Sequence, residues 1–165
     1  MDFVVQCDYE NQELCALCGG ACCRRCPGAT HPSDWPERNF RAALVTALVR
    51  GFYALDYGMY EGPEESKQVF YVRPSIRGSA KVVEASWGGQ CAFLADNGCV
   101  LDLDKRPAEC RHMEPRMAGF GYGPLHCWGH GSRRQTLEIW RPYQNLVIDA
   151  ACAALGERKD HPWGG

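Results

Sequence analysis

The sequence has little excess charge and no long hydrophobic run. Its 18 Lys and Arg against 20 Asp and Glu leave a formal net charge of −2, which favours neither nucleic acid nor an anionic membrane as a partner. The longest apolar stretch, residues 42–49, is interrupted by Thr46 and falls well short of the roughly 18 residues of a membrane span. Residues 1–6 carry neither the basic start nor the apolar core of a secretory signal. We therefore expect a cytoplasmic protein without membrane contact.

Several common catalytic patterns are also missing. The chain has no recognisable Ser-His-Asp set, paired-carboxylate motif or phosphate-binding loop. Residues 119–123 are rich in glycine, but they lack the strand-then-helix setting of a nucleotide loop and are interpreted as a loop. There is no internal repeat, and 165 residues suit a single domain. We predict one cysteine-cluster metal-binding domain over residues 1–165, with its core at about 7–155.

Cysteine, in contrast, is abundant, with eleven residues in the chain. Disulfides would require an oxidising compartment and leave one cysteine over. Buried free thiols would explain a few scattered cysteines, but not five between Cys15 and Cys26. Bunched thiols in a reducing compartment are typical of metal binding. We therefore predict that fold and function depend on metal held by thiolates.

The first cysteine group contains a Cys-x-x-Cys step, Cys15 to Cys18, followed by two glycines. Two intervening residues let both sulfurs face one point, and glycine allows the turn that follows. Cys22 and Cys23 are adjacent, and neighbouring side chains usually diverge. Such a pair serves one ion poorly, which favours more than one metal atom.

The second group lies in settings typical of turns and helix starts. Cys91 ends a strand-like stretch, Cys99 follows an Asn-Gly turn, and Cys110 follows Pro107 at a predicted helix start. Helix N–H groups and the flanking arginines Arg106 and Arg111 would favour a thiolate at position 110. Ordinary surface charge is the alternative reading of these arginines.

Together the two groups give eight predicted metal ligands. They are Cys15, Cys18, Cys22, Cys23, Cys91, Cys99, Cys110 and Cys127. Eight thiolates suit two zinc sites or two iron–sulfur clusters, because thiolate sites accept both metals, and iron is slightly favoured. Cys127 is the ligand that a histidine could replace; the candidates are His112, His126 and His130. Cys152 is predicted to be a small core residue of a helix rather than a ligand.

These motifs, in this order, resemble the YkgJ-type cysteine-cluster family, described as a zinc- or iron-chelating domain. The resemblance rests on Cys15 to Cys23, Cys91-Ala92-Phe93-Leu94, Gly98-Cys99 and Arg106-Pro107-Ala108-Glu109-Cys110-Arg111, and it covers about residues 14–127. The stretch 140–144, Trp-Arg-Pro-Tyr-Gln, is similar to a C-terminal element of some members. The chain departs from the pattern in having three residues between Cys18 and Cys22. The resemblance excludes Cys26, which lies outside the pattern, and Cys7, which precedes it.

The expected fold is α+β: a small single domain with two main helices, a short antiparallel sheet and metal-stapled cysteine-rich loops. The first helix is expected over about 36–50, with Ser33 or Asp34 as its cap and Gly51 as its stop. The second is expected over 133–155, where Pro142 allows a kink or a fresh start.

Two short strands are expected between the helices. Residues 68–73 and 80–86 have the composition of strands and are predicted to pair antiparallel. The acidic residues 61–65 before them are expected to form a solvated loop.

Three functions fit these expectations. The first is a redox or interaction module built on iron–sulfur or zinc, with a protein as its partner. The second is a metal-dependent protein-modifying enzyme, since the family's cysteine cluster resembles that of a flagellin lysine N-methylase. The third is a purely structural zinc domain that supports a macromolecular interaction. An open coordination position would favour the enzyme, and closed four-cysteine sites would favour the other two.

Overall fold

The computed structural model describes residues 23–24, 27–85, 88–96, 98–111, 113–117, 125–129 and 133–160, the backbone alone for 113–117, 125–129 and 159–160. These residues form a small α+β domain. The helices are α3 (Phe40–Arg50), α4 (Ala108–Arg111), α5 (Arg133–Trp140) and α6 (Gln144–Asp160), with 3₁₀ turns η1 (Pro32–Asp34), η2 (Leu103–Lys105) and η3 (Arg141–Tyr143). The strands are β1 (Tyr53–Glu61), β2 (Ser66–Pro74), β3 (Leu94–Ala95), β4 (Gly98–Cys99), β5 (Met113–Met117) and β6 (Leu125–Gly129).

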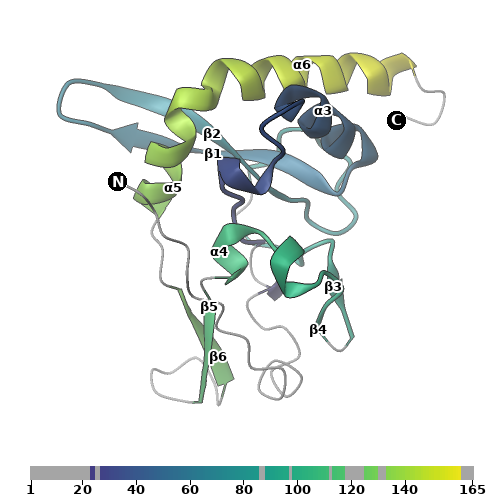
Figure 1. The fold of residues 1–165 in the computed structure, drawn as a ribbon, viewed down its shortest axis with the longest axis vertical. Helices are drawn as coiled ribbons and strands as arrows, with labels where there is room; N and C mark the ends of the chain where they lie inside the picture. The colour runs from purple at the N-terminus through teal and green to yellow at the C-terminus, as the bar shows by residue number, and fades with distance from the viewer. Residues whose placement is uncertain are drawn as a thin grey trace.

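The upper half of the molecule is a long hairpin packed against helices. Strands β1 and β2 pair antiparallel over nine residues each, from Tyr53 opposite Pro74 to Glu61 opposite Ser66. Helix α6 runs across the top beside α3, and α5 turns down along the hairpin (Figure 1). The core lies between these elements. Its fully buried apolar residues are Leu44, Leu48, Leu55, Val69, Val72, Trp140, Val147, Ala150 and Ala154.

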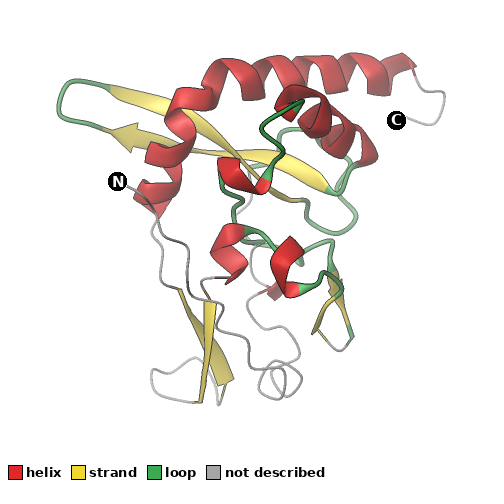
Figure 2. Ribbon diagram, viewed as in Figure 1, coloured by secondary structure: helices red, strands yellow, loops and turns green. Residues whose placement is uncertain are grey.

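The lower half holds the second cysteine group on short elements. Helix α4, the two-residue strands β3 and β4, and η2 lie there among loops (Figure 2). Strands β3 and β4 form one antiparallel pair and β5 and β6 another. The sheets formed by the described residues are thus three separate two-stranded hairpins. The expectation that the cysteine-bearing region consists of turns and short elements is confirmed for these residues.

One charged side chain sits inside the hairpin. Arg73 on β2 is completely buried and donates from Nε to Asp56 at 3.0 Å and from Nη1 to Glu84 at 2.8 Å. Its Nη1 and Nη2 also donate to the carbonyl oxygens of Pro74 and Glu84, each at 2.8 Å. The hydroxyl of Tyr71 donates to Asp56 at 3.1 Å. Buried charge is tolerated only when it is paired and hydrogen-bonded, and this guanidinium meets both conditions.

The C-terminal helical stretch is broken at Pro142, one of the two outcomes expected for it. The single turn η3 separates α5 from α6, so the described chain has three helices of eight residues or more rather than two. At this break Gln144 faces the edge of β2. Its side chain accepts from the Phe70 N–H and donates to the Phe70 carbonyl, both at 2.8 Å. A side-chain amide thereby satisfies the backbone groups that the strand edge leaves unpaired.

The first helix begins later than expected. It starts at Phe40, after Asn39 in a left-handed conformation, and ends at Gly51 as predicted. Pro36 therefore does not lie in its first turn, and neither Ser33 nor Asp34 caps it. Both residues belong instead to the separate turn η1, which His31 caps by accepting from the Ser33 N–H at 3.0 Å.

The strand prediction is right for β2 and wrong for its partner. The segment expected over 68–73 extends to Ser66–Pro74, but it pairs with β1, which the sequence did not suggest. Residues 80–86 form no regular strand in their described part, and Val83 makes only an isolated parallel bridge to Leu55. The same segment places Glu84 beside Arg73 as a charge partner. The loop between the strands, residues 62–65, is polar as expected.

We predict that Arg73→Met lowers the free energy of unfolding by about 3–5 kcal/mol, because it leaves Asp56 and Glu84 buried without a cationic partner. The matched control is Arg134→Met, which removes an arginine whose side chain is 68% exposed and pairs with Glu138 on the surface of α5. That change should cost less than about 1 kcal/mol. Urea unfolding followed by circular dichroism measures both. A loss at Arg73 no larger than at Arg134 would contradict the assignment.

Candidate metal centre

Two cysteines distant in sequence are joined through their backbones. The N–H of Cys91 donates to the carbonyl oxygen of Cys23 at 2.7 Å. Cys91 itself is buried, and it bridges antiparallel to Ile76, just beyond the end of β2. The chain around Cys23 is thus fixed against the segment that leads into β3. This contact brings the end of the first cysteine group to the start of the second.

Cys99 is held in the small hairpin that follows. It pairs with Leu94 across β3 and β4, and the N–H of Leu94 donates to the carbonyl of Cys91 at 3.1 Å. Next to it, the N–H of Val100 donates to the carbonyl of Phe93 at 2.9 Å. Gly98 precedes Cys99 with φ at +118°, a backbone conformation that favours glycine. Gly98 and Cys99 thus form strand β4, and Asn97, the first residue of the turn expected from the sequence, lies outside the described residues.

Cys110 lies on α4, which the segment 27–35 holds in place. The N–H of Ala29 donates to the Glu109 carboxylate at 2.6 Å, and the Glu109 N–H donates back to the Ala29 carbonyl at 3.1 Å. Gly28 passes so close that a Cβ there would lie 2.6 Å from the Cys110 sulfur. The close approach explains glycine at this position, since only a residue without a side chain fits.

Asp34 ties the same helix to η1. Its Oδ2 accepts from the Ala108 N–H at 2.9 Å, and its Oδ1 accepts from Arg111 at 2.8 Å. Asp34 was predicted to cap the first long helix, but its hydrogen bond at a helix start goes to α4 instead. Arg111 also donates to the carbonyl of Arg106, and Arg106 donates from Nε to the carbonyl of Leu101 at 3.0 Å. These contacts stabilise the turn around Cys110. The proposed effect of the two arginines on its thiol stays a prediction.

The segment 27–35 is itself anchored in the core. The Thr30 N–H and hydroxyl both donate to the carbonyl of Val72, each at 2.8 Å. The indole of Trp140 donates to the Thr30 carbonyl at 2.7 Å. Thr30 is buried, so these bonds are shielded from water. The short helix that carries Cys110 is therefore linked to both β2 and α5.

Tyr53 is a residue that sequence reasoning missed. Its ring lies edge-on to Trp35 at 5.3 Å and tilted against Phe93 at 5.5 Å. Burial raises the pKa of its phenol to about 12, and the charge of Asp34 adds to that effect. Three cysteine thiolates act in the same direction: Cys110, Cys91 and Cys99.

The three cysteines come from different parts of the chain. Cys91 lies in the segment before β3, Cys99 on β4 and Cys110 on α4, and each contributes to the charge that acts on the Tyr53 phenol. The sequence signal that could have revealed this residue is weak, since tyrosine at a strand start is common.

Four of the eight predicted ligands have described side chains: Cys23, Cys91, Cys99 and Cys110. Cys127 lies on β6 opposite Pro115, and only its backbone is described. Cys15, Cys18 and Cys22 lie outside the described residues, as do His112 and His130, while His126 is placed by its backbone on β6.

Within the described part of the chain, no three His, Cys, Asp or Glu side chains are grouped tightly enough to hold one ion. A metal ion bound by the second cysteine group would therefore need further thiol ligands from residues outside the described part of the chain.

Of the cysteines predicted not to bind metal, only Cys152 is described. It lies on α6, but it is exposed, so its prediction as a core residue is wrong. The apolar stripe of that helix runs through Val147, Ala150, Ala151 and Ala154, and Cys152 points away from it. Cys7 and Cys26 lie outside the described residues.

Comparisons with known proteins identify no relative. No family model matches the chain, no curated protein resembles it, and no solved structure is similar to it. Among the helices of the described chain, none has the length and apolar character needed to cross a membrane.

We predict that Gly28→Ala displaces Cys110, because the new Cβ would overlap its sulfur and approach its backbone nitrogen to 3.2 Å. Overpacking of this kind should cost about 1–3 kcal/mol. The control is Gly156→Ala on α6, where a Cβ meets nothing within 4 Å and should stabilise the helix by about 0.5–1 kcal/mol. Urea unfolding and the rate of Cys110 alkylation measure the effect. Equal stability and equal alkylation in wild type and Gly28→Ala would count against the close packing.

Proposed function

We propose that the protein binds metal through cysteine thiolates, as an iron–sulfur cluster or zinc, and acts as a redox or interaction module. We also propose, from the order of its cysteine motifs, that it belongs to the YkgJ-type family. The observation that carries the proposal is the hydrogen bond from the Cys91 N–H to the Cys23 carbonyl at 2.7 Å, which joins the first cysteine group to the second.

The way Cys91, Cys99 and Cys110 are held supports the proposal. Two of them are fixed to segments far away in the sequence: Cys91 by a backbone hydrogen bond to Cys23, and Cys110 by close packing against Gly28. Cys99 is held locally, by its pairing with Leu94 across β3 and β4. Cysteines that only filled a core would have no reason to gather outside it. None of the side chains in the main hydrophobic cluster is a cysteine. Cysteines held on short segments outside the main hydrophobic cluster are instead typical of a metal centre.

The first cysteine group would complete the ligand set. Cys23 is its last proposed member, and its carbonyl bonds to Cys91, so the chain leading to Cys22, Cys18 and Cys15 departs from beside the second group. Thiolates from both groups would then share one centre or two neighbouring ones. The proposed ligands are the eight cysteines named from the sequence, with Cys127 the one that a histidine could replace.

Single replacement of cysteine by serine tests the ligand assignment, because serine keeps the size of the side chain but binds soft metals poorly. We expect Cys91→Ser, Cys99→Ser and Cys110→Ser each to lose bound metal after anaerobic purification. The matched control is Cys152→Ser, since that thiol is exposed on α6, away from the other cysteines. Elemental analysis gives the metal content, and visible absorption distinguishes an iron–sulfur protein from a colourless zinc protein. Full metal content in Cys110→Ser would overturn the assignment.

The position of the core predicts how metal removal acts. The main hydrophobic cluster is built from α3, α5, α6 and the long hairpin and contains no cysteine. The sequence alone led us to expect the whole fold to depend on metal. With a core free of cysteine, we expect instead that a chelator under reducing conditions loosens residues 91–111 and leaves α3 and α6 folded. Hydrogen exchange followed by mass spectrometry measures both regions, with untreated protein as the control. Equal protection of residues 91–111 before and after verified metal loss would argue against a metal-held centre.

A further inference from the structure

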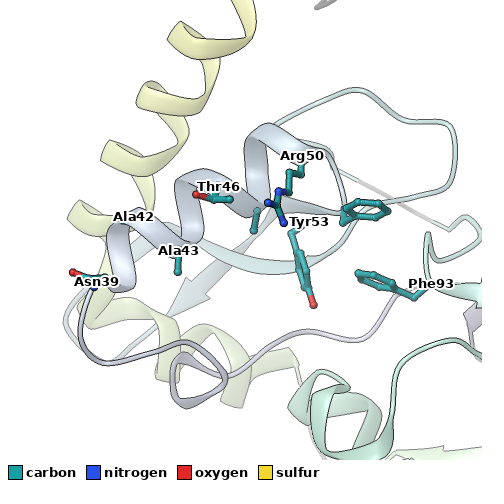
Figure 3. A pocket seen from close by; sticks show the side chains of 9 residues that line it. Asn39, Ala42, Ala43, Thr46, Arg50, Tyr53 and Phe93 are labelled. Carbon is teal, nitrogen blue, oxygen red and sulfur yellow. The ribbon is translucent and has the colours of Figure 1, made fainter.

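A groove runs between α3 and the start of the lower half, with a volume of about 510 Å³. One side is the small-residue face of α3, including Ala42, Ala43 and Thr46; the other is formed by Phe52, Tyr53 and Phe93 (Figure 3). The small side chains of the helix keep the groove open.

The aromatic wall is unusually exposed. The ring of Phe52 is stacked on that of Phe93, with centroids 5.7 Å apart and planes 19° apart, yet Phe52 is 51% exposed. Val100, whose N–H bonds to the Phe93 carbonyl, is 62% exposed and extends the apolar surface toward Cys99. A contiguous apolar patch at the surface is typical of a site where another molecule docks.

The groove has a charge of one sign. Arg50 lines it, and none of the other lining residues is charged. No ion pair to Arg50 is found among the described residues, although other exposed arginines such as Arg41 and Arg134 are paired. A cation beside an apolar surface favours an apolar ligand that carries a carboxylate, which arginine binds in a bidentate manner.

We propose that this groove docks an apolar segment of a partner protein that carries a carboxylate for Arg50. The extent of the patch beyond the groove, from Phe52 to Val100, fits a chain segment better than a compact small molecule. Phe93 lies two residues after Cys91, so the bound segment would run past the cysteines of the second group. The docking site does not depend on whether those cysteines hold metal.

The test uses three labelled synthetic peptides of twelve residues, in which leucine and phenylalanine alternate with glutamate, glutamine or lysine. Fluorescence anisotropy with the full-length protein as purified should show the glutamate peptide binding about ten-fold or more tightly than the glutamine peptide. Metal content is measured in the same samples, so that loss of the metal centre and loss of docking are distinguished.

Substitutions in the groove test which of its residues determine peptide binding. Arg50→Gln should remove the preference for glutamate, and Arg50→Glu should reverse it in favour of the lysine peptide. Phe52→Ser should weaken all three peptides. The matched control is Arg38→Glu, an exposed arginine before α3 that does not line the groove, and it should bind as the wild type does. Circular dichroism checks that each variant is folded.

Three outcomes would overturn the proposal. One is the absence of measurable binding of the glutamate peptide to folded wild type. Another is an unchanged preference in both Arg50 variants. The third is a dimer in light scattering that Phe52→Ser dissociates, which would make a second copy of this chain the occupant.

Discussion

The arrangement of the molecule depends on three of the hydrogen bonds that Thr30 makes, those that join it to the core. Its N–H and hydroxyl are bound to the Val72 carbonyl, and its own carbonyl accepts from Trp140. A buried polar backbone must find partners, and here they come from the central hairpin and from the end of α5. The segment 27–35 is thereby fixed along the side of the core. From that position Ala29 and Asp34 orient α4, and with it Cys110. The contacts made by a single threonine thus connect the hydrophobic half to the cysteines.

The helices were predictable because their signals are local. Gly51 ends α3 where the sequence suggests, and Pro142 breaks the C-terminal stretch by removing a donor. The strand β1 was missed because its inner half is buried on both faces, so the alternation that marks a half-exposed strand is absent. The opposite error was made around Glu84, where a strand was predicted over 80–86 and none is formed in the described part. A segment with the composition of a strand serves instead to deliver a carboxylate to Arg73, a requirement that only the folded hairpin reveals.

In the candidate site, too, some features follow from the local sequence and others depend on distant contacts. The backbone conformation of Gly98 before Cys99 follows from the residue itself, since glycine adopts a positive φ at little cost. The joint effect of Cys91, Cys99 and Cys110 on the Tyr53 phenol does not follow, because it depends on contacts between segments far apart in the chain. Asp34 illustrates this. Its sequence position suits a cap on the following helix, but its carboxylate accepts from Ala108, which comes 74 residues later.

The separation of the core from the cysteines has a consequence for how such a protein could work. The helices and the long hairpin bury the apolar residues that stabilise the fold, whereas Cys99 and Cys110 are carried on elements of two and four residues. Such short elements bury little surface, so their geometry is set by a few hydrogen bonds and, under the proposed function, by the metal that the thiols would hold. A change in ligation could then shift β3, β4 and α4 without unfolding the core. Because Phe93 joins the Cys91 segment to Tyr53 and Phe52, that shift would reach the exposed aromatic wall directly. Under the proposed function, ligation of the thiols would thus influence the proposed docking surface through one aromatic side chain, although no cysteine lines the groove itself.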